Sequence, residues 1–307
     1  MKISQYFLYL VIGLSLSSCL TGEPVQDELV APPPVNEMSQ TTPLPTPDRS
    51  LPDGWALSRK PKEDSLEAQC GNYSRKEWKV ETENGQVKIS PAPHGGKVDE
   101  IAKVPAKIRE FVEKHRAPGN GTGQLHIEPY ENGWLVGSDS GEWGGTLVWY
   151  SDNADRKKEL IEENIRGIAK LENETLILSG MAHLSIDEGK IWKLVRDASG
   201  EFKALLLKDL GSQPQGFVVK DNYLLVALNN KFVRVSLSGE VTILNQTSLT
   251  SFYPNSMAIT SSGVVYVGAR HFVVRFVPAK DGYKEEWLVP QNCQKFFVKE
   301  MDCVCGG

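Results

Sequence analysis

The sequence predicts an all-β fold, a five-bladed β-propeller, with six blades as the alternative count. Three observations support this: a repeat of 41 to 47 residues, short strand-like segments within each repeat, and further strand-like segments at both ends of residues 54–307. A four-stranded unit of about 40 to 45 residues has the size of one propeller blade. A solenoid or a β-sandwich would have a similar composition but would explain the period less well.

Two independent sets of residues define the repeat. Small residues end the second strand of each unit at spacings of 43, 47 and 41, and residues of the third strands follow at spacings of 43, 41 and 41. The first set is Gly137, Gly180, Ala227 and Gly268, and the second is Trp149, Trp192, Val233 and Val274. The strands are rich in Val, Ile, Leu and aromatic residues, with Gly, Asn, Asp and Ser at their ends, as β-strands require. These four repeats therefore predict four blades.

The two ends of the folded part predict a fifth blade. Residues 77–83 and 86–90 flank an Asn84–Gly85 turn and predict a β-hairpin. Residues 295–299 and 302–305 predict two more strands near the C-terminus. If these N- and C-terminal strands pair, they complete one blade and close the ring.

One helix is expected before the first full blade. Residues 105–116 begin with Pro105 and carry apolar side chains at Ile108, Phe111 and Val112. This spacing predicts an amphipathic helix, with Pro at an early position, that lies outside the ring or over one mouth of its channel.

The N-terminal segment predicts export. An apolar run over residues 6–16 follows Lys2 and is too short for the roughly 20 residues of a spanning helix, so residues 1–18 are expected to be a signal peptide. The run closes with Leu16-Ser17-Ser18-Cys19, which resembles the lipobox of bacterial lipoproteins. The resemblance implies cleavage before Cys19, acylation of Cys19 with palmitate-type chains, and attachment to the membrane through this N-terminal lipid. A plain secretory peptide with an incidental cysteine is the alternative.

Location and partners follow from the same region and from the charge. Leu20 after the acylated cysteine resembles lipoproteins of the outer membrane that face the periplasm, because the retention residue Asp is absent there. Residues 19–53 contain many prolines and few apolar residues, which predicts a disordered tether. The formal net charge is −5, which argues against a nucleic-acid partner because that would need a basic face.

Four further cysteines are expected to form disulfides, because an exported protein meets an oxidising compartment. They are Cys70, Cys293, Cys303 and Cys305. Cys303 and Cys305 are two residues apart, where a mutual bridge in an extended strand would be strained. At least one bridge is therefore expected from Cys70 to the C-terminal group, although the exact pairing stays open and zinc is the alternative.

Loops that join second to third strands, and loops between blades, open on one face of a propeller and are its best candidate for binding. The candidate ligand-binding residues on this face are Asp139, Glu142, Trp143, Arg166, His183, Asn255, Arg270 and His271; the same loops carry Asp187, Gln213, Gln215 and Asn229. The glycine-rich segment 139–145 is the most unusual loop. An exposed Trp143 beside Glu142 would suit a sugar or a protein partner, although filling the gap between blades is the simpler role for Trp143.

Two blade openings resemble a known group of propellers. Pro214-Gln215-Gly216 and Pro254-Asn255-Ser256 are similar to the openings of NHL and SMP-30/gluconolactonase propellers. That resemblance implies a divalent metal at the channel, and Asn255 matches one ligand position. Ser256 stands where the pattern has Gly, and no set of carboxylates accompanies Asn255, so no metal ligand or other cofactor is assigned.

The sequence therefore predicts a lipid-anchored binding or scaffold protein of the cell envelope, with a protein or a glycan as its partner. A metal-dependent propeller hydrolase or lactonase is the alternative, and a spacer within a larger envelope assembly is a third. The chain lacks the Gly-x-Ser-x-Gly motif of a serine nucleophile. His183 and His271 fall on one predicted face and would serve as a general acid and base if the protein were an enzyme.

Overall fold

A computed structural model describes residues 50–92, 104–114, 124–293, 295–299 and 302–306 of the 307-residue chain. The predicted signal peptide, Cys19 and nearly all of the predicted tether lie outside the described residues. Among the described residues, no helix is long and apolar enough to cross a membrane.

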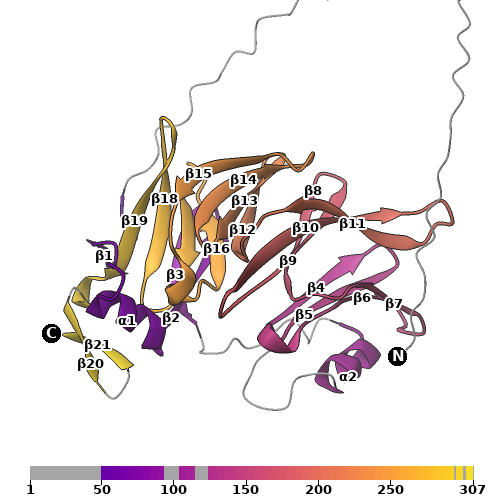
Figure 1. Cartoon of the computed structure of the whole chain (residues 1–307), viewed down its shortest axis with the longest axis horizontal. Coiled ribbons are helices and arrows are strands. Elements are labelled where there is room, and N and C mark those ends of the chain that lie inside the picture. Colours follow the sequence, from indigo (N-terminus) through magenta and orange to yellow (C-terminus); the bar gives the residue numbers. More distant parts are fainter. Residues whose placement is uncertain (1–49, 93–103, 115–123, 294, 300–301, 307) are drawn as a thin grey trace, which may run out of the picture. The chain divides into compact units, whose positions relative to one another are not determined.

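Four antiparallel sheets follow one another along the chain, and Figure 1 shows their strands. The first sheet contains β4 (Gln124–Tyr130), β5 (Gly133–Asp139), β6 (Leu147–Ser151) and β7 (Lys157–Ile161). The second contains β8 (Ile165–Leu171), β9 (Glu174–His183), β10 (Ile186–Arg196) and β11 (Phe202–Asp209). The third contains β12 (Pro214–Lys220), β13 (Tyr223–Leu228), β14 (Lys231–Ser236) and β15 (Val241–Gln246). The fourth contains β16 (Ser256–Ile259), β17 (Val265–Gly268), β18 (Val273–Ala279) and β19 (Gly282–Pro290).

Each sequence repeat is thus one four-stranded sheet like a propeller blade, with its strands paired in chain order. The middle strands are apolar on both faces because both faces are covered, and β17 is buried at all four positions. A separate apolar cluster fills the space between each pair of successive sheets. Between the third and fourth sheets, the rings of Phe232 and Phe276 stack with centroids 4.4 Å apart. Full burial of such a side chain contributes about 1.5–3 kcal/mol, so the contacts between sheets stabilise the whole array.

The chain ends meet in the fourth sheet, as expected, but through a different strand. β1 (Trp55–Ser58) pairs antiparallel with β19, with Trp55 opposite Pro290. The predicted pairing of the N-terminal hairpin with the C-terminal strands is not found in the described part of the chain. β2 (Glu77–Glu83) pairs with β3 (Gln86–Ala92), while β20 (Lys295–Lys299) pairs with β21 (Asp302–Gly306), as two separate two-stranded sheets.

Packing explains this arrangement of the ends. The Trp55 ring lies edge-on to the Trp78 ring of β2, at 4.9 Å between centroids. Val80 of β2 is buried against Ala258 and Tyr266 of the fourth sheet. The β2–β3 hairpin therefore covers a face of the fourth sheet, and β1 extends the edge of that same sheet.

The predicted helix is confirmed and covers the first sheet. Helix α2 (Ala106–Lys114) buries Ile108 against Ile127, Val136 and Val148. The helix thus packs on one face of the first sheet, where apolar side chains of β4, β5 and β6 need a cover.

A disulfide joins Cys70 to Cys303, with 5.2 Å between their Cα atoms. It connects helix α1 (Leu66–Tyr73), which begins after the N-cap residue Ser65, to β21. The predicted bridge from Cys70 to the C-terminal cysteines is therefore present. Cys293, in the 3₁₀ helix η4 (Gln291–Cys293), is also disulfide-bonded, and the side chain of Cys305 lies outside the described set.

Candidate functional site

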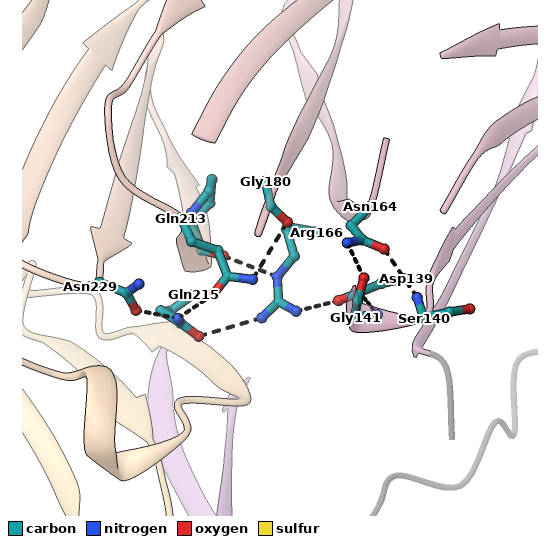
Figure 2. A network of polar contacts seen from close by, with 10 residues as sticks. Asp139, Ser140, Gly141, Asn164, Arg166, Gly180, Gln213, Gln215 and Asn229 are labelled. Carbon is teal, nitrogen blue, oxygen red and sulfur yellow. Dashed lines mark hydrogen bonds and ion pairs between the residues drawn. The ribbon is translucent and has the colours of Figure 1, made fainter. Parts of the chain in front are cut away.

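A shift in pairing register occurs in both β8 and β12, and it positions two central side chains of the candidate site. The pairing register of β8 shifts between Ile165 and Gly167, and that of β12 shifts between Pro214 and Gly216. Each shift leaves one residue outside the ladder, Arg166 in β8 and Gln215 in β12. A bulge of this kind re-aims a side chain and is common beside functional sites. The two re-aimed side chains meet, because Nη2 of Arg166 donates to Oε1 of Gln215 over 3.4 Å (Figure 2).

Arg166 also connects the first and second sheets. Its Nη1 forms an ion pair with the carboxylate of Asp139, which is buried at the end of β5. The other carboxylate oxygen accepts the backbone N–H of Gly141 over 2.9 Å. The Nε atom of Arg166 donates to the carbonyl of Pro214 over 3.1 Å. The predicted residues Asp139 and Arg166 therefore lie together, and their charges compensate each other.

Amide side chains extend this network into the third sheet (Figure 2). Nε2 of Gln215 donates to Oε1 of Gln213 over 2.8 Å and also to Asn229. Asp187 accepts hydrogen bonds of 2.8 Å from Ser212 Oγ, Gln213 N and Asn229 Nδ2. A continuous polar network thus joins three successive sheets and fixes the loop face.

The glycine-rich loop after β5 projects from this network. Asn164 holds the loop, because it accepts from Ser140 N over 3.1 Å and donates to Gly141 O over 2.7 Å. Gly141 has a φ of +61°, a conformation that favours glycine. The 3₁₀ helix η2 (Gly141–Trp143) that follows ends in Trp143, whose side chain is 81 % exposed. Among the described residues, Trp143 therefore fills no gap between blades.

Trp143 shares its surroundings with the tip of the β9–β10 hairpin. Oε2 of Glu142 and Nε2 of His183 lie 3.0 Å apart, which brings two further predicted residues together. The tip exposes Leu184 at 95 % and Ile186 at 45 %. Exposed apolar groups of this kind mark interaction sites more often than isolated surface residues do.

His126 was not among the predicted residues, and it lies beside the Arg166–Asp139 pair. It occupies β4 opposite Gly137, and its Nε2 is buried without a hydrogen-bond partner among the described residues. Burial, assisted by the charge of Arg166 and opposed by that of Asp139, lowers the pKa of His126 to about 4. The imidazole is therefore uncharged at neutral pH. The sequence did not indicate that His126 lies beside this ion pair, because any inward-facing residue fits the alternating pattern of a strand.

Asn255 precedes β16, and its backbone N–H donates to Gly268 O of β17 over 2.9 Å. Its Oδ1 accepts from Ser256 Oγ over 2.7 Å, while Ser256 Oγ accepts from Val80 N over 2.9 Å. Ser256 lies against Gly216, the residue after Gln215. The Nδ2 of Asn255 is buried and finds no hydrogen-bond partner within the described part of the chain.

The last two predicted residues belong to a different set of contacts. Arg270 pairs with Glu77 over 2.9 Å, and its guanidinium lies 3.8 Å from the centroid of the Tyr253 ring. His271 is buried, with its backbone N–H donating to Lys76 O over 2.8 Å and its Nε2 3.8 Å from Cys293 Sγ. These contacts connect the segment around α1 and β2 to the fourth sheet, so both residues have a structural role. The structure thus pairs His183 with Glu142 and encloses His271, rather than presenting the two imidazoles as an acid–base pair.

A metal site would need several of these side chains to converge on one point. Within the described ranges, no group of three or more His, Cys, Asp or Glu side chains is arranged to hold a metal ion. The acidic residues of the network, Asp139 and Asp187, are instead occupied by Arg166 and by backbone and amide donors.

Comparison with known proteins gives distant structural matches alone. No family model matches the chain, and no curated protein matches it. Virginiamycin B lyase from Staphylococcus aureus matches at 14 % identity and a TM-score of 0.36, over 70 % of this chain and 63 % of that one. A streptogramin B lyase matches at 15 % and 0.36, over 69 % of each chain. A luciferin-regenerating enzyme matches at 9 % and 0.39, over 75 % of this chain and 80 % of that one. The description of the fold therefore rests on the sheet topology.

Proposed function

We propose that this chain is a lipid-anchored binding or scaffold protein of the cell envelope. The loop face of its propeller-like array of blades, five in the complete ring, binds a protein or a glycan. The observation that carries the proposal is Trp143, exposed at 81 % at the end of a loop that is hydrogen-bonded to Asn164, just before the second sheet begins. An exposed Trp on a rigid support is a typical centre of a binding surface.

The loop that carries Trp143 is held in place by hydrogen bonds, which favours a role for Trp143 in binding a partner. Because Asn164 and Asp139 hold the loop through three hydrogen bonds of 2.7 to 3.1 Å, little conformational freedom remains to be lost when a partner binds. Leu184 and Ile186 add apolar area beside it, and the Glu142–His183 pair adds polar groups at its border. An apolar centre with a polar border is the usual composition of a binding surface.

The proposed location rests on the sequence and on one covalent feature. The lipobox-like segment Leu16–Cys19 supports attachment by an N-terminal lipid, and Leu20 supports an outer-membrane position facing the periplasm. The Cys70–Cys303 disulfide agrees with an oxidising compartment of this kind.

The test is capture of partners by the full chain, purified in detergent, from extracts of the cell envelope. Wild type, Trp143→Ala and Leu205→Ala are compared, and retained proteins and glycans are identified by mass spectrometry. Leu205 on β11 is the matched control, because it is also an exposed apolar residue, at 53 %. We expect one defined component to be retained by wild type and Leu205→Ala and lost from Trp143→Ala. Equal retention by all three proteins would contradict the proposal.

A further inference from the structure

A cavity of about 600 Å³ lies between the first and second sheets, and its volume is in the usual range of ligand pockets. Its wall comes from the β4–β5, β6–β7 and β10–β11 turns and from the strand ends beside them. β5 begins at the cavity and ends at Asp139, where the loop of Trp143 starts. β10 begins at Ile186, beside that loop, and ends at Arg196, which lines the cavity. The cavity therefore lies at the opposite end of both sheets from Trp143.

Two buried aromatic rings form the apolar part of the cavity wall and support two guanidinium groups. Trp149 of β6 and Phe202 of β11 lie with their ring centroids 5.0 Å apart. Cζ of Arg156 lies 5.6 Å from the Trp149 centroid, and Cζ of Arg196 lies 4.1 Å from the Phe202 centroid. A cation over an aromatic ring is attracted to the face of that ring. The rings therefore hold both guanidinium groups beside the cavity.

Two cations of the wall have carboxylate partners within the protein. Arg196 forms an ion pair with Glu131 and also donates to Gly200 O. Lys158 Nζ lies 2.9 Å from Glu201 Oε2, which joins β7 to the β10–β11 turn. These contacts hold the turns together, and they compensate the charges of both cations.

Arg156 differs, because its backbone is fixed while its guanidinium is available to a ligand. Its N–H donates to Ser151 Oγ over 3.1 Å, and its carbonyl accepts from Ser151 N over 3.0 Å. The side chain is 67 % exposed, and its guanidinium donates no hydrogen bond within the described part of the chain. The carboxylate of Asp155 lies 4.0 Å from Nε of Arg156 and accepts from Ser151 Oγ. Arg156 can therefore bind a further carboxylate in the bidentate geometry typical of arginine.

The charges of the cavity favour an anionic ligand that also carries hydrogen-bond donors. Cations outnumber carboxylates in the wall, although the whole chain has a formal net charge of −5. The charged lining residues are Arg156, Lys157, Lys158, Arg196, Asp155 and Glu201. A phosphate group carries a charge of about −1.5 to −2 at neutral pH, so Asp155 and Glu201 would repel it. A peptide with acidic side chains instead offers singly charged carboxylates to Arg156 and backbone N–H donors to Asp155 and Glu201.

We propose that this cavity is a second binding site, which takes an acidic peptide segment of a partner protein. A carboxylate of the peptide forms a bidentate pair with Arg156, and backbone N–H groups of the peptide donate to the carboxylates of Asp155 and Glu201. The inference goes beyond the proposed function, because the cavity and Trp143 lie at opposite ends of the same two sheets.

Calorimetric titration of the full chain in detergent at neutral pH tests the inference. The first probe is a tetrapeptide of alternating Asp and Glu with an acetylated N-terminus and an amidated C-terminus. The second is the same peptide with Asn and Gln in place of Asp and Glu, which keeps the shape and removes the charges. Inorganic phosphate is the third probe, and it distinguishes a carboxylate site from a phosphate site.

The variants are Arg156→Gln, which removes the charge, and Arg156→Lys, which keeps the charge but removes the planar guanidinium. Arg234→Gln is the matched control. Arg234 of β14 is also exposed, and its Cζ likewise lies 5.6 Å from an aromatic centroid, that of Tyr223, but it does not line the cavity. A thermal unfolding scan of each variant ensures that binding is compared between folded proteins.

We expect the acidic peptide to bind wild type and Arg234→Gln equally, and to bind Arg156→Gln about tenfold more weakly or worse, which corresponds to about 1.4 kcal/mol. Arg156→Lys should lie between them, because an ammonium group attracts a carboxylate without the bidentate geometry. The uncharged peptide and phosphate should bind more weakly than the acidic peptide.

Three results overturn the inference: no binding of the acidic peptide, equal binding by wild type and Arg156→Gln, or tighter binding of phosphate or of the uncharged peptide. Trp143→Ala should bind the acidic peptide as wild type does, because Trp143 lies outside the cavity. If the peptide does not bind but capture of an envelope component depends on Trp143, the inference fails while the proposed function stands. If the peptide binds through Arg156 but no capture depends on Trp143, the proposed function fails while the inference stands.

Discussion

The imidazole of His126, whose Nε2 is buried, makes stability depend on pH in a defined window. Burial lowers the pKa of His126 from its ordinary value of 6.5 to about 4 in the folded chain. Between these two values the unfolded chain binds a proton at His126 and the folded chain does not. The free energy of unfolding therefore falls as the pH drops from 6.5 towards 4, and the contribution of His126 is fully present above pH 6.5.

The size of the effect follows from the same two values. One pKa unit corresponds to about 1.4 kcal/mol, so the difference between 6.5 and about 4 corresponds to about 3 kcal/mol at full protonation of the unfolded chain. This is a large fraction of the roughly 5–15 kcal/mol by which folded domains are usually stable. Other groups also titrate in this range, so the prediction concerns the difference between wild type and a variant without the imidazole.

The assay is urea unfolding of wild type and His126→Phe from about pH 7 to about pH 4, with the midpoint and slope measured at each pH. Across this range, the free energy of unfolding of wild type should fall by about 3 kcal/mol more than that of His126→Phe. At neutral pH the variant should be at least as stable as wild type, because it removes a buried polar atom without a described partner. His183→Gln is the control, since His183 is about half exposed and its ion pair with Glu142 contributes little. Parallel pH profiles for wild type and His126→Phe would refute the reasoning.

Two further predictions concern covalent and packing constraints. Cys70→Ser removes a disulfide between residues 233 positions apart in the sequence. Under non-reducing conditions it should therefore lower the thermal midpoint and reduce the free energy of unfolding by about 2–5 kcal/mol. An unchanged midpoint would show that Cys70 does not secure the chain ends, and the difference from wild type should disappear in reductant. Gly167→Ala would place a Cβ 2.2 Å from Cε1 of Phe217. Urea unfolding should therefore show that the free energy of unfolding falls by about 1–3 kcal/mol. Adding Phe217→Leu should recover part of that loss, and a neutral Gly167→Ala would contradict the close packing of β8 on β12.

The sequence determined the repeating part of this protein, because its signals are local. Alternating apolar strands and turn residues recur at a fixed period, and each repeat became one four-stranded sheet. The spacing of Ile108 with its apolar neighbours likewise predicted helix α2. The expected export and the strained spacing of Cys303 and Cys305 predicted a bridge from Cys70, but the choice of Cys303 needed the structure.

The tertiary structure alone decided how distant segments meet. β1 is four residues long and has no periodicity that distinguishes it, so its pairing with β19 depends on the packing of Trp55 and Trp78. The sequence placed Asp139 and Arg166 on one face, but their ion pair requires the bulge that re-aims Arg166. His126 could not be found from the sequence, because the burial of its imidazole and the nearby charges arise from sheets that are separate in the chain. Local patterns therefore specified the blades, whereas contacts between blades specified the site.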